Sequence, residues 1–218
     1  DCYNREHTMP QSWFGSGAPM DTDLHHILPT DGWVNQQRGN LPYGEVGATD
    51  WTGQNGTRVG ESNWPGYTGT VCEPIDAYKG DAARIYFYMM TRYVGQVGGW
   101  SSPMLQAGDL SPWAESLLLS WHTADPVSTK EVDRNNAIYA LQGNRNPFID
   151  NPAWASSLWG PVASIELDPD EFYVSVIQRV GSVHLKRSGA EGSQVRLLDA
   201  AGRTVVDQAW STSEAHLP

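Results

Sequence analysis

The chain has 218 residues, which is enough for one domain of ordinary size and a small second one, and 39% of them are hydrophobic, including ten Trp and nine Tyr. Its 14 basic and 25 acidic residues give a net charge of −11, which excludes a protein that holds nucleic acid by bulk charge attraction. No apolar run approaches the roughly 20 residues that cross a bilayer, so we expect no membrane span, and any export signal would be removed or lie upstream.

Short strands and long ordered loops are expected over residues 1–70, which are rich in Gly, Pro and Asn. This stretch also holds a carboxylate, an imidazole and a carboxamide, on Glu6, His7 and Asn35. Such groups can supply oxygen ligands for a divalent metal and a base that works near neutral pH. On a regular strand, Glu6 and His7 point to opposite faces, so a metal ligand and a base would approach a phosphodiester from different sides.

Helices are expected at four places. Thr30 or Asp31 can cap a short helix that carries Asn35. Three longer helices follow from apolar periodicity, Pro at the first helical position and capping signals. They are a largely buried helix within 75–93, a helix that starts at Pro112 with Ser111 as its N-cap, and a helix that runs from the capping box 128–131 to Gly143.

After residue 160 the hydrophobic pattern changes to period two, which predicts strands. The strand segments are 172–177, 182–187 and 195–206, the last with a turn at 200–202. We therefore place a domain boundary here, with residues 1–160 as one domain and residues 161–218 as a small β module. A generic β-hairpin appendage is the alternative interpretation of this module.

Three blocks, taken in order, resemble the secreted endonuclease I family. They are REH at 5–7, DLHH at 23–26 and VNQQRGN at 34–40, and residues 2–14 follow the pattern YNREH-x-x-P-x-S-W-F of that family. The resemblance continues to about residue 160. It implies an α+β fold with a ββα-metal (His-Me finger) nuclease core, surrounded by helices and followed by a small β-sandwich-like C-terminal module.

The resemblance also implies roles for single residues. His7 would be the general base, and Glu6 and Asn35 would hold the metal, which is expected to be Mg²⁺, with Ca²⁺ or Mn²⁺ as alternatives. Asp21 falls where some relatives place a carboxylate that helps to protonate the leaving group, although an exposed loop aspartate is the simpler interpretation. The pair at 25–26 invites a zinc interpretation, but in this family the segment is structural and lines the active site.

Arginines are the expected contacts to substrate phosphate, because guanidinium presents paired donors to phosphate oxygens. Arg5, Arg38 and Arg145 all lie within the shared blocks and are assigned this role. Each could equally be a structural arginine. For Arg84, which lies within an expected helix, we favour the structural role.

Cys2 and Cys72 are the two cysteines of the chain. Each adjoins a motif block, and the composition is typical of a secreted protein, so a Cys2–Cys72 disulfide is the favoured interpretation. Two buried free thiols are the alternative. The spacing of the two cysteines matches no zinc-binding pattern.

The function implied by the resemblance is that of a secreted, metal-dependent endonuclease that leaves 5′-phosphate and 3′-hydroxyl ends. Cleavage of DNA, and of RNA as well, would be nearly independent of base sequence, since the family contacts the backbone. The protein is expected to be monomeric and either secreted or at the cell surface. Two alternatives stay open: a non-catalytic secreted binding module on a degenerate nuclease fold, and a metal-dependent phosphoesterase for small phosphates.

The C-terminal segment 195–208 is similar to the sorting domains of the type IX secretion system. That similarity implies the secretion machinery as a partner. Members of both families generally extend beyond the corresponding ends of this sequence. We therefore expect the chain to be truncated at its front and at its end.

Overall fold

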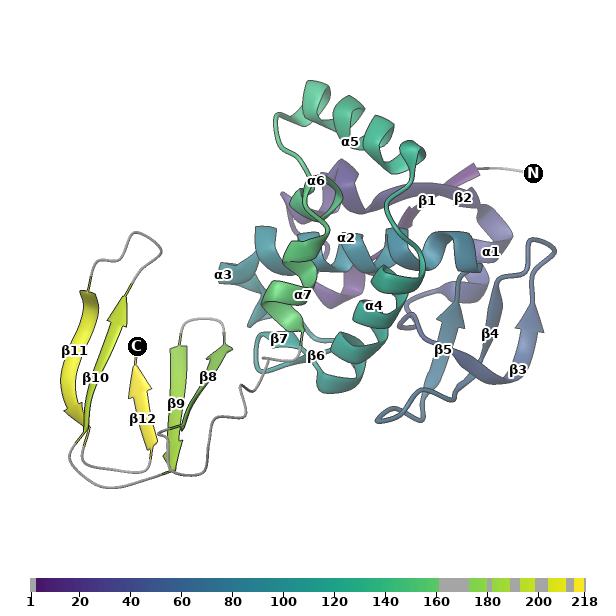
Figure 1. Cartoon of the computed structure of the whole chain (residues 1–218). Helices are drawn as coiled ribbons and strands as arrows, with labels where there is room; N and C mark the ends of the chain where they lie inside the picture. The colour runs from purple at the N-terminus through teal and green to yellow at the C-terminus, as the bar shows by residue number, and fades with distance from the viewer. Residues whose placement is uncertain are drawn as a thin grey trace. The chain divides into compact units, whose positions relative to one another are not determined.

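The structure is a computed structural model that describes residues 3–160 and, beyond them, the backbone of five strands. The chain divides into two compact units, Asp1–Gly160 and Pro161–Pro218 (Figure 1). The first unit combines helices with small antiparallel sheets, as an α+β fold requires. No helix in the described part of the chain is long and apolar enough to cross a membrane.

The first unit begins with a strand, a stretch of three short 3₁₀ helices, a second strand and a helix. Strand β1 (Tyr3–His7) pairs antiparallel with β2 (Ile27–Asp31), and β2 leads straight into α1 (Gly32–Arg38). The Asp31 side chain accepts hydrogen bonds from the backbone N–H groups of Trp33 and Val34, so Asp31, and not Thr30, is the N-cap of this helix. This ββα unit carries all three residues of the expected metal and base set.

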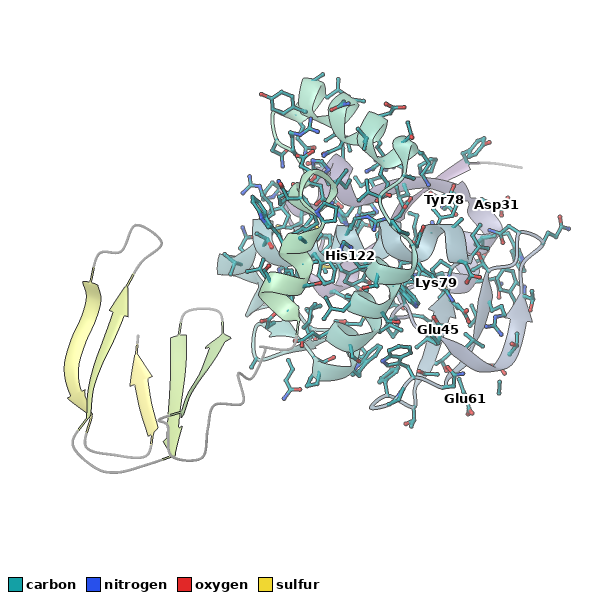
Figure 2. The ribbon with its side chains drawn as sticks, in the orientation of Figure 1. Asp31, Glu45, Glu61, Tyr78, Lys79 and His122 are labelled. Atoms are coloured by element: carbon teal, nitrogen blue, oxygen red, sulfur yellow. The ribbon has the colours of Figure 1, made fainter. Side chains whose placement is uncertain are left out.

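A second sheet has the strand order β3-β4-β5, with β3 at Val46–Thr52, β4 at Arg58–Ser62 and β5 at Thr70–Glu73. Gly60 is required in β4, because a Cβ there would lie 2.0 Å from the Ala48 carbonyl oxygen. Lys79, the first residue of the next helix, connects that helix to this sheet. Its Nζ lies 3.0 Å from both Glu45 carboxylate oxygens (Figure 2) and 2.8 Å from Glu73 Oε1 on β5.

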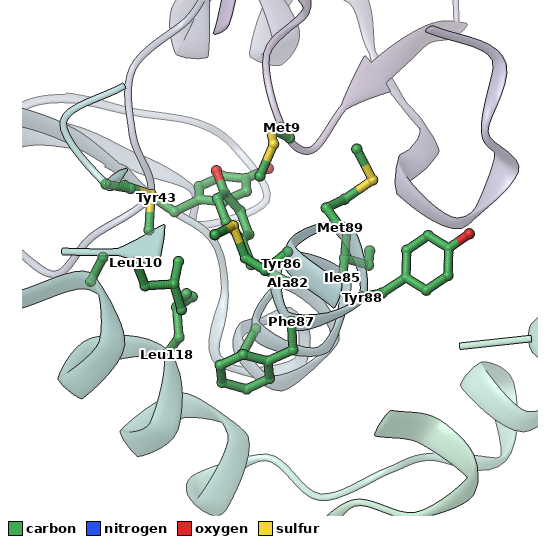
Figure 3. Packing of buried hydrophobic residues seen from close by; sticks show 14 of the residues in the cluster. Met9, Tyr43, Ala82, Ile85, Tyr86, Phe87, Tyr88, Met89, Leu110 and Leu118 are labelled. Carbon is green, nitrogen blue, oxygen red and sulfur yellow. The ribbon is translucent and has the colours of Figure 1, made fainter. Parts of the chain in front are cut away.

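Helix α2 (Lys79–Arg92) forms the centre of the core, and its residues are buried without interruption from Gly80 to Met90. Its large side chains leave the helix in several directions, as Figure 3 shows for Tyr86, Phe87 and Met89. A helix that is buried on every side must be enclosed by other elements, and its buried Asp81 and Arg84 must find polar partners there. Helix α4 (Pro112–Ala124) packs along it, and the remaining elements of this unit are α3 (Val94–Val97), the β6–β7 pair (Leu105–Gln106 and Asp109–Leu110), α5 (Thr129–Gln142), α6 (Pro147–Asp150) and α7 (Ala153–Trp159).

The helix ends follow the sequence signals with one difference. Ser128 and Glu131 form both hydrogen bonds of a capping box at the start of α5, and Gly143 ends that helix with a φ of 78°, a conformation that favours glycine. Ser111 is the N-cap of α4 by position. Its hydroxyl, however, donates to the Pro103 carbonyl at 3.3 Å, so it makes no side-chain capping bond.

The second unit consists of strands in two antiparallel groups, β12-β9-β8 and β10-β11. Their bounds are β8 Tyr173–Arg179, β9 Ser182–Ser188, β10 Ser193–Leu198, β11 Thr204–Trp210 and β12 Glu214–Leu217. The period-two segments therefore form strands, as predicted. The expected turn at 200–202 lies outside the described residues.

Cys72 lies in β5 and is a buried free thiol in the described part of the chain, and burial raises its pKa to about 12. Cys2 lies outside the described residues. The Cys2–Cys72 disulfide therefore stays a prediction.

Mass spectrometry of oxidised protein is expected to find Cys2 linked to Cys72. Closing a loop of this length would stabilise the fold by about 4 kcal/mol in the chain-entropy model, so reduction should lower the Tm. The variant Cys2→Ser should show the same lower Tm without reductant, and adding reductant should then change nothing. Two thiols that are both alkylated in unreduced, denatured protein would contradict the bridge.

Candidate active site

The ββα unit brings Asn35 against the strand that carries Glu6. In α1, the Asn35 Nδ2 group donates to the backbone carbonyl of Arg5 at 3.5 Å, and Arg5 directly precedes Glu6. Because a carbonyl oxygen accepts and cannot donate, this contact fixes which end of the amide faces the strand. Asn35 Oδ1 is then left without a hydrogen bond to any described residue.

The Glu6 carboxylate is buried, with 6% of the residue exposed, and its described hydrogen bonds all reach one oxygen. Arg38 Nη1 pairs with Oε1, and the Tyr43 hydroxyl lies 3.5 Å from the same atom. Burial raises the pKa of Glu6 above its ordinary value, while the Arg38 guanidinium acts against that rise. Oε2 of Glu6 and Oδ1 of Asn35 are both oxygen acceptors of the kind that Mg²⁺ and Ca²⁺ prefer, so this pair fits a hard cation.

The hydrogen bonding of His7 indicates which of its ring nitrogens carries the proton. His7 Nε2 lies 3.0 Å from the backbone carbonyl of Asp21, so Nε2 carries the proton. The neutral ring then has its lone pair on Nδ1. The Asp21 carboxylate lies nearby, with Oδ1 3.7 Å from His7 Nε2, and it also accepts a hydrogen bond from Gln11.

The two histidines of the DLHH block, His25 and His26, are buried and donate hydrogen bonds to backbone carbonyls. His26 Nε2 donates to the Met20 carbonyl at 2.7 Å, and its ring packs edge-on against His7 with centroids 5.2 Å apart. His25 Nε2 donates to the Asn144 carbonyl at 3.2 Å. Burial lowers the pKa of His26 to about 4, so this ring is neutral near pH 7. Among the described residues, no group of three or more His, Cys, Asp or Glu side chains could hold a metal ion.

Arg38, one of the three expected phosphate contacts, is buried with 3% of the residue exposed. Besides Glu6, its guanidinium donates to the carbonyls of His7 at 2.8 Å, Thr8 at 2.7 Å and Leu41 at 3.0 Å. With its donors engaged in this way, Arg38 holds the end of β1 in place and is not presented to a substrate. The sequence assigned it to phosphate because a motif does not show which side chains fold inward.

The other two expected phosphate contacts differ from one another. Arg145 forms a forked ion pair with Asp150, with two bonds of 2.7 Å, and also donates to Asn136. Arg5 is exposed on β1, and its guanidinium makes no hydrogen bond or ion pair with another described residue. Of the three, Arg5 is the arginine that the structure leaves available beside Glu6 and His7.

Comparison with known proteins decides the family. The family model for Endonuclease I matches residues 1–153, which include the whole ββα unit. The chain belongs to the endonuclease I family. The match lies within the first compact unit.

Several nucleases are similar in sequence to this chain. An extracellular ribonuclease from Bacillus amyloliquefaciens is 40% identical over 167 residues, covering 72% of this chain and 54% of the relative. An Endonuclease-1 from Buchnera aphidicola subsp. Baizongia pistaciae is 31% identical over 130 residues (60% and 46%), and an extracellular deoxyribonuclease from Aeromonas hydrophila is 28% identical over 133 residues (60% and 50%). The chain spans about half the length of these relatives.

Two residues that support the candidate site lie outside the three motif blocks that were used to predict it. Arg134 of α5 donates to the carbonyls of Leu24 and, at 2.9 Å, Ile27. The Tyr86 hydroxyl of α2 donates to the Thr8 carbonyl at 3.1 Å. Helical periodicity predicts that Tyr86 faces inward but does not identify its partner, and it gives no such signal for the polar Arg134.

The buried His26 is expected to make the stability of this family member depend on pH. Its folded-state pKa of about 4 lies below the ordinary 6.5, so the stability that it contributes is present above pH 6.5 and is lost as pH falls toward 4. The loss should reach about 3 kcal/mol. Denaturant unfolding at a series of pH values measures the free energy of unfolding. Between pH 6.5 and 4, this free energy should fall less steeply in His26→Gln than in the parent.

Asp81 serves as a control for the sign of this effect. Its pKa is raised to about 6, mainly by burial, so its contribution changes in the opposite direction over the same pH range. In Asp81→Asn, the free energy of unfolding should therefore fall more steeply than in the parent as the pH is lowered. If the free energy of unfolding depends on pH equally in His26→Gln and in the parent, His26 is not the group that causes the loss of stability in acid.

Proposed function

We propose that this endonuclease I family member is a secreted, metal-dependent endonuclease that hydrolyses phosphodiester bonds of DNA and RNA with little regard to base sequence. The observation that carries the proposal is the ββα unit, which brings together a buried carboxylate on Glu6, an amide oxygen on Asn35 and an imidazole on His7 with a free Nδ1 lone pair. The extracellular nucleases among its relatives support both the secretion and the substrate class.

In this mechanism, His7 Nδ1 takes a proton from the attacking water. The Asp21 carbonyl holds the Nε2 proton throughout, so the ring keeps one orientation as it becomes positively charged. The His26 ring packs edge-on against the His7 ring, with centroids 5.2 Å apart, and Phe14 packs against His26, with centroids 5.8 Å apart. Asp21 stays the residue proposed to protonate the leaving 3′ oxygen, which gives 5′-phosphate and 3′-hydroxyl products.

Glu6 and Asn35 are the proposed ligands of the metal, with Mg²⁺ expected and Ca²⁺ or Mn²⁺ as alternatives. When bound, such an ion supplies Lewis-acid stabilisation of the negative charge that grows on the phosphate oxygens. Arg38 engages Glu6 Oε1, so Oε2 is the oxygen proposed to bind the ion. The exposed Arg5 guanidinium is proposed to bind a substrate phosphate, which supplies local attraction in a chain of net charge −11.

The proposal is tested by incubating the full chain with supercoiled plasmid, single-stranded DNA and RNA, in Mg²⁺, Ca²⁺ or Mn²⁺ and in EDTA. We expect cleavage of the polymers that needs the metal, and ends that carry 5′-phosphate. Binding of nucleic acid without cleavage in any metal would identify a non-catalytic module. Hydrolysis of p-nitrophenyl phosphate with no cleavage of polymers would identify a phosphoesterase for small phosphates.

Removal of either metal ligand is expected to weaken Mg²⁺ binding by about 10-fold or more and to abolish turnover, because each provides one of two protein oxygens. Titration calorimetry of Glu6→Ala and Asn35→Ala measures the binding directly. Glu61→Ala is the matched control, since Glu61 is an exposed carboxylate on β4 (Figure 2). Unchanged Mg²⁺ affinity in both ligand variants would place the ion elsewhere.

We propose that the second unit, residues 161–218, serves export by binding the secretion machinery. Its support is the similarity of segment 195–208 to type IX sorting domains, together with the five strands of this unit. In a host with that system, nuclease activity in the medium should depend on the last 58 residues, while activity in the lysate should not. Equal export with and without them would contradict the proposal.

A further inference from the structure

Asp23 is a buried carboxylate that the proposed chemistry does not use, with 5% of the residue exposed. Its Oδ2 accepts hydrogen bonds from the hydroxyls of Tyr88 and Tyr93, each at 2.7 Å. Its Oδ1 accepts from Gln142 Nε2 at 2.7 Å and from the His25 backbone N–H at 2.9 Å. The two tyrosines belong to α2 and its C-cap and Gln142 is the last residue of α5, so one carboxylate is tied to two helices.

The four hydrogen bonds keep this carboxylate ionised. Burial would raise the pKa of Asp23, but the bonds from Tyr93, Gln142 and Tyr88 outweigh burial, and the pKa lies below its ordinary value. A buried charge is tolerated when its lone pairs are satisfied, and it becomes costly when a donor is removed. The position of Asp23 is therefore strongly determined by α2 and α5.

Asp23 directly follows the helical turn whose Asp21 carbonyl contacts His7. The short 3₁₀ helix Met20–Thr22 directly precedes it, and the Asp23 backbone N–H donates to the Met20 carbonyl at 3.1 Å. The middle residue of this turn is Asp21, whose carbonyl accepts the Nε2 proton of His7. The anchored carboxylate is thus two residues from the carbonyl that sets the tautomer of the base.

The same network holds the segment on the other side of Asp23. The Leu24 backbone N–H donates to Gln142 Oε1 at 3.0 Å, and the His25 ring packs on Tyr88 with centroids 4.5 Å apart. This segment continues into β2, the partner strand of β1. Both backbone routes from Asp23 therefore lead to the end of β1 where His7 lies.

We propose that Asp23 is a positioning residue for His7: anchored by Tyr88, Tyr93 and Gln142, it fixes the Met20–Thr22 turn so that the Asp21 carbonyl keeps the proton on Nε2 and the lone pair on Nδ1. The kinetic part of this proposal rests on the proposed function. The structural part, the tautomer of His7, does not.

The test uses the full chain as Asp23→Asn and as the double variant Tyr88→Phe/Tyr93→Phe. Nitrogen-15 NMR of the neutral His7 ring, without metal, reports which ring nitrogen carries the proton. The parent should show the Nε2–H form, and both variants should show a mixture that includes the Nδ1–H form. Cleavage should lose about 10-fold in kcat, as is typical when support of a site residue is lost, with KM changing by less than about twofold.

Tyr67→Phe is the matched control, because Tyr67 packs on Trp113 and its hydroxyl makes no hydrogen bond to a described residue. This variant should keep both the tautomer and kcat. If the chain proves to be no nuclease, the NMR readout still decides the positioning role. A folded double variant with an unchanged His7 tautomer would overturn the proposal, and if that variant does not fold, the single variant Tyr88→Phe gives the same decision.

Discussion

Replacement of His7 by alanine is expected to lower the rate of phosphodiester cleavage by about 10²- to 10⁴-fold, which is the usual contribution of a general base. The expectation rests on the proposed mechanism, in which the Asp21 carbonyl accepts a hydrogen bond from Nε2 and Nδ1 takes the proton of the attacking water. The measurement is the initial rate of plasmid nicking and of single-strand cleavage under saturating Mg²⁺.

A second variant distinguishes the contribution of the His7 base from that of the His7 hydrogen bond to the Asp21 carbonyl. His7→Gln keeps an N–H donor of similar reach toward the Asp21 carbonyl but has no titratable nitrogen. An equal loss in both variants supports proton transfer, whereas near-normal activity in His7→Gln would show that only the hydrogen bond matters. Mg²⁺ affinity should be largely retained in both, since the proposed ligands are Glu6 and Asn35.

Local features of the fold were predictable because their causes lie within a few residues. The cap at Asp31, the capping box of Ser128 with Glu131, and the end of α5 at Gly143 all depend on contacts between near neighbours in the chain. The order of β1, β2 and α1 agrees with the order that the three motif blocks implied, while a metal-binding role for this unit stays a prediction. Short-range physics and a continuous resemblance were sufficient here.

The sheet β3-β4-β5 shows where prediction from sequence stopped. Its residues are rich in Gly and polar side chains, and only short strands within loops were expected. Pairing between β4 and β5 places Val59 opposite Cys72, a register that depends on the chain between them and on packing against the core. Strand propensity depends on such partners, which a single sequence does not display.

The role of Arg38 could not be predicted for a related reason. Its partner Glu6 is 32 positions away, and its other acceptors are backbone carbonyls that the sequence does not distinguish. A motif arginine was therefore assigned to phosphate, although the fold directs it inward. The Asp23 network could not be predicted for the same reason, because Tyr88 and Tyr93 lie 65 and 70 positions from Asp23 in the sequence.

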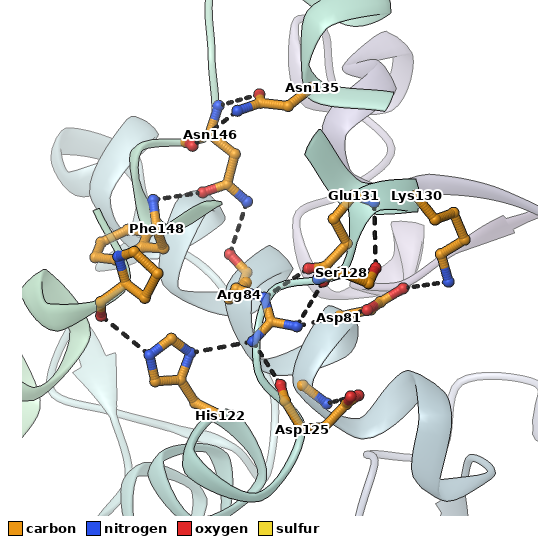
Figure 4. A network of polar contacts seen from close by, with 12 residues as sticks. Asp81, Arg84, His122, Asp125, Ser128, Lys130, Glu131, Asn135, Asn146 and Phe148 are labelled. Atoms are coloured by element: carbon orange, nitrogen blue, oxygen red, sulfur yellow. Dashed lines mark hydrogen bonds and ion pairs between the residues drawn. The ribbon is translucent and has the colours of Figure 1, made fainter. Parts of the chain in front are cut away.

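Arg84 was expected to be structural, and the structure shows the network that makes it so (Figure 4). Its side chain is fully buried and forms a forked pair with Glu131, with bonds of 2.5 and 2.8 Å. It also donates to the Asp125 carbonyl at 2.8 Å and lies 3.5 Å from His122 Nδ1. One guanidinium thus joins α2 to α4, to α5 and to the loop between them.

Arg84→Met is expected to destabilise the first unit by about 3–5 kcal/mol, because it leaves the buried Glu131 carboxylate without its cation. Denaturant unfolding followed by near-UV circular dichroism measures this loss in the Trp-rich first unit. Arg58→Met is the matched control: Arg58 pairs with Glu73 at 2.5 Å, but its side chain is 37% exposed, so its loss should cost about 0–1 kcal/mol.

The double variant Arg84→Met/Glu131→Gln tests the cause of the loss. Glutamine at position 131 can keep the capping box with Ser128 while removing the buried charge. If the unpaired carboxylate is the main cost, the double variant should be more stable than Arg84→Met alone. If it is no more stable, the loss comes from the bonds to Asp125 and His122 and from the packing of the arginine stem between the helices, and the charge of Glu131 contributes little.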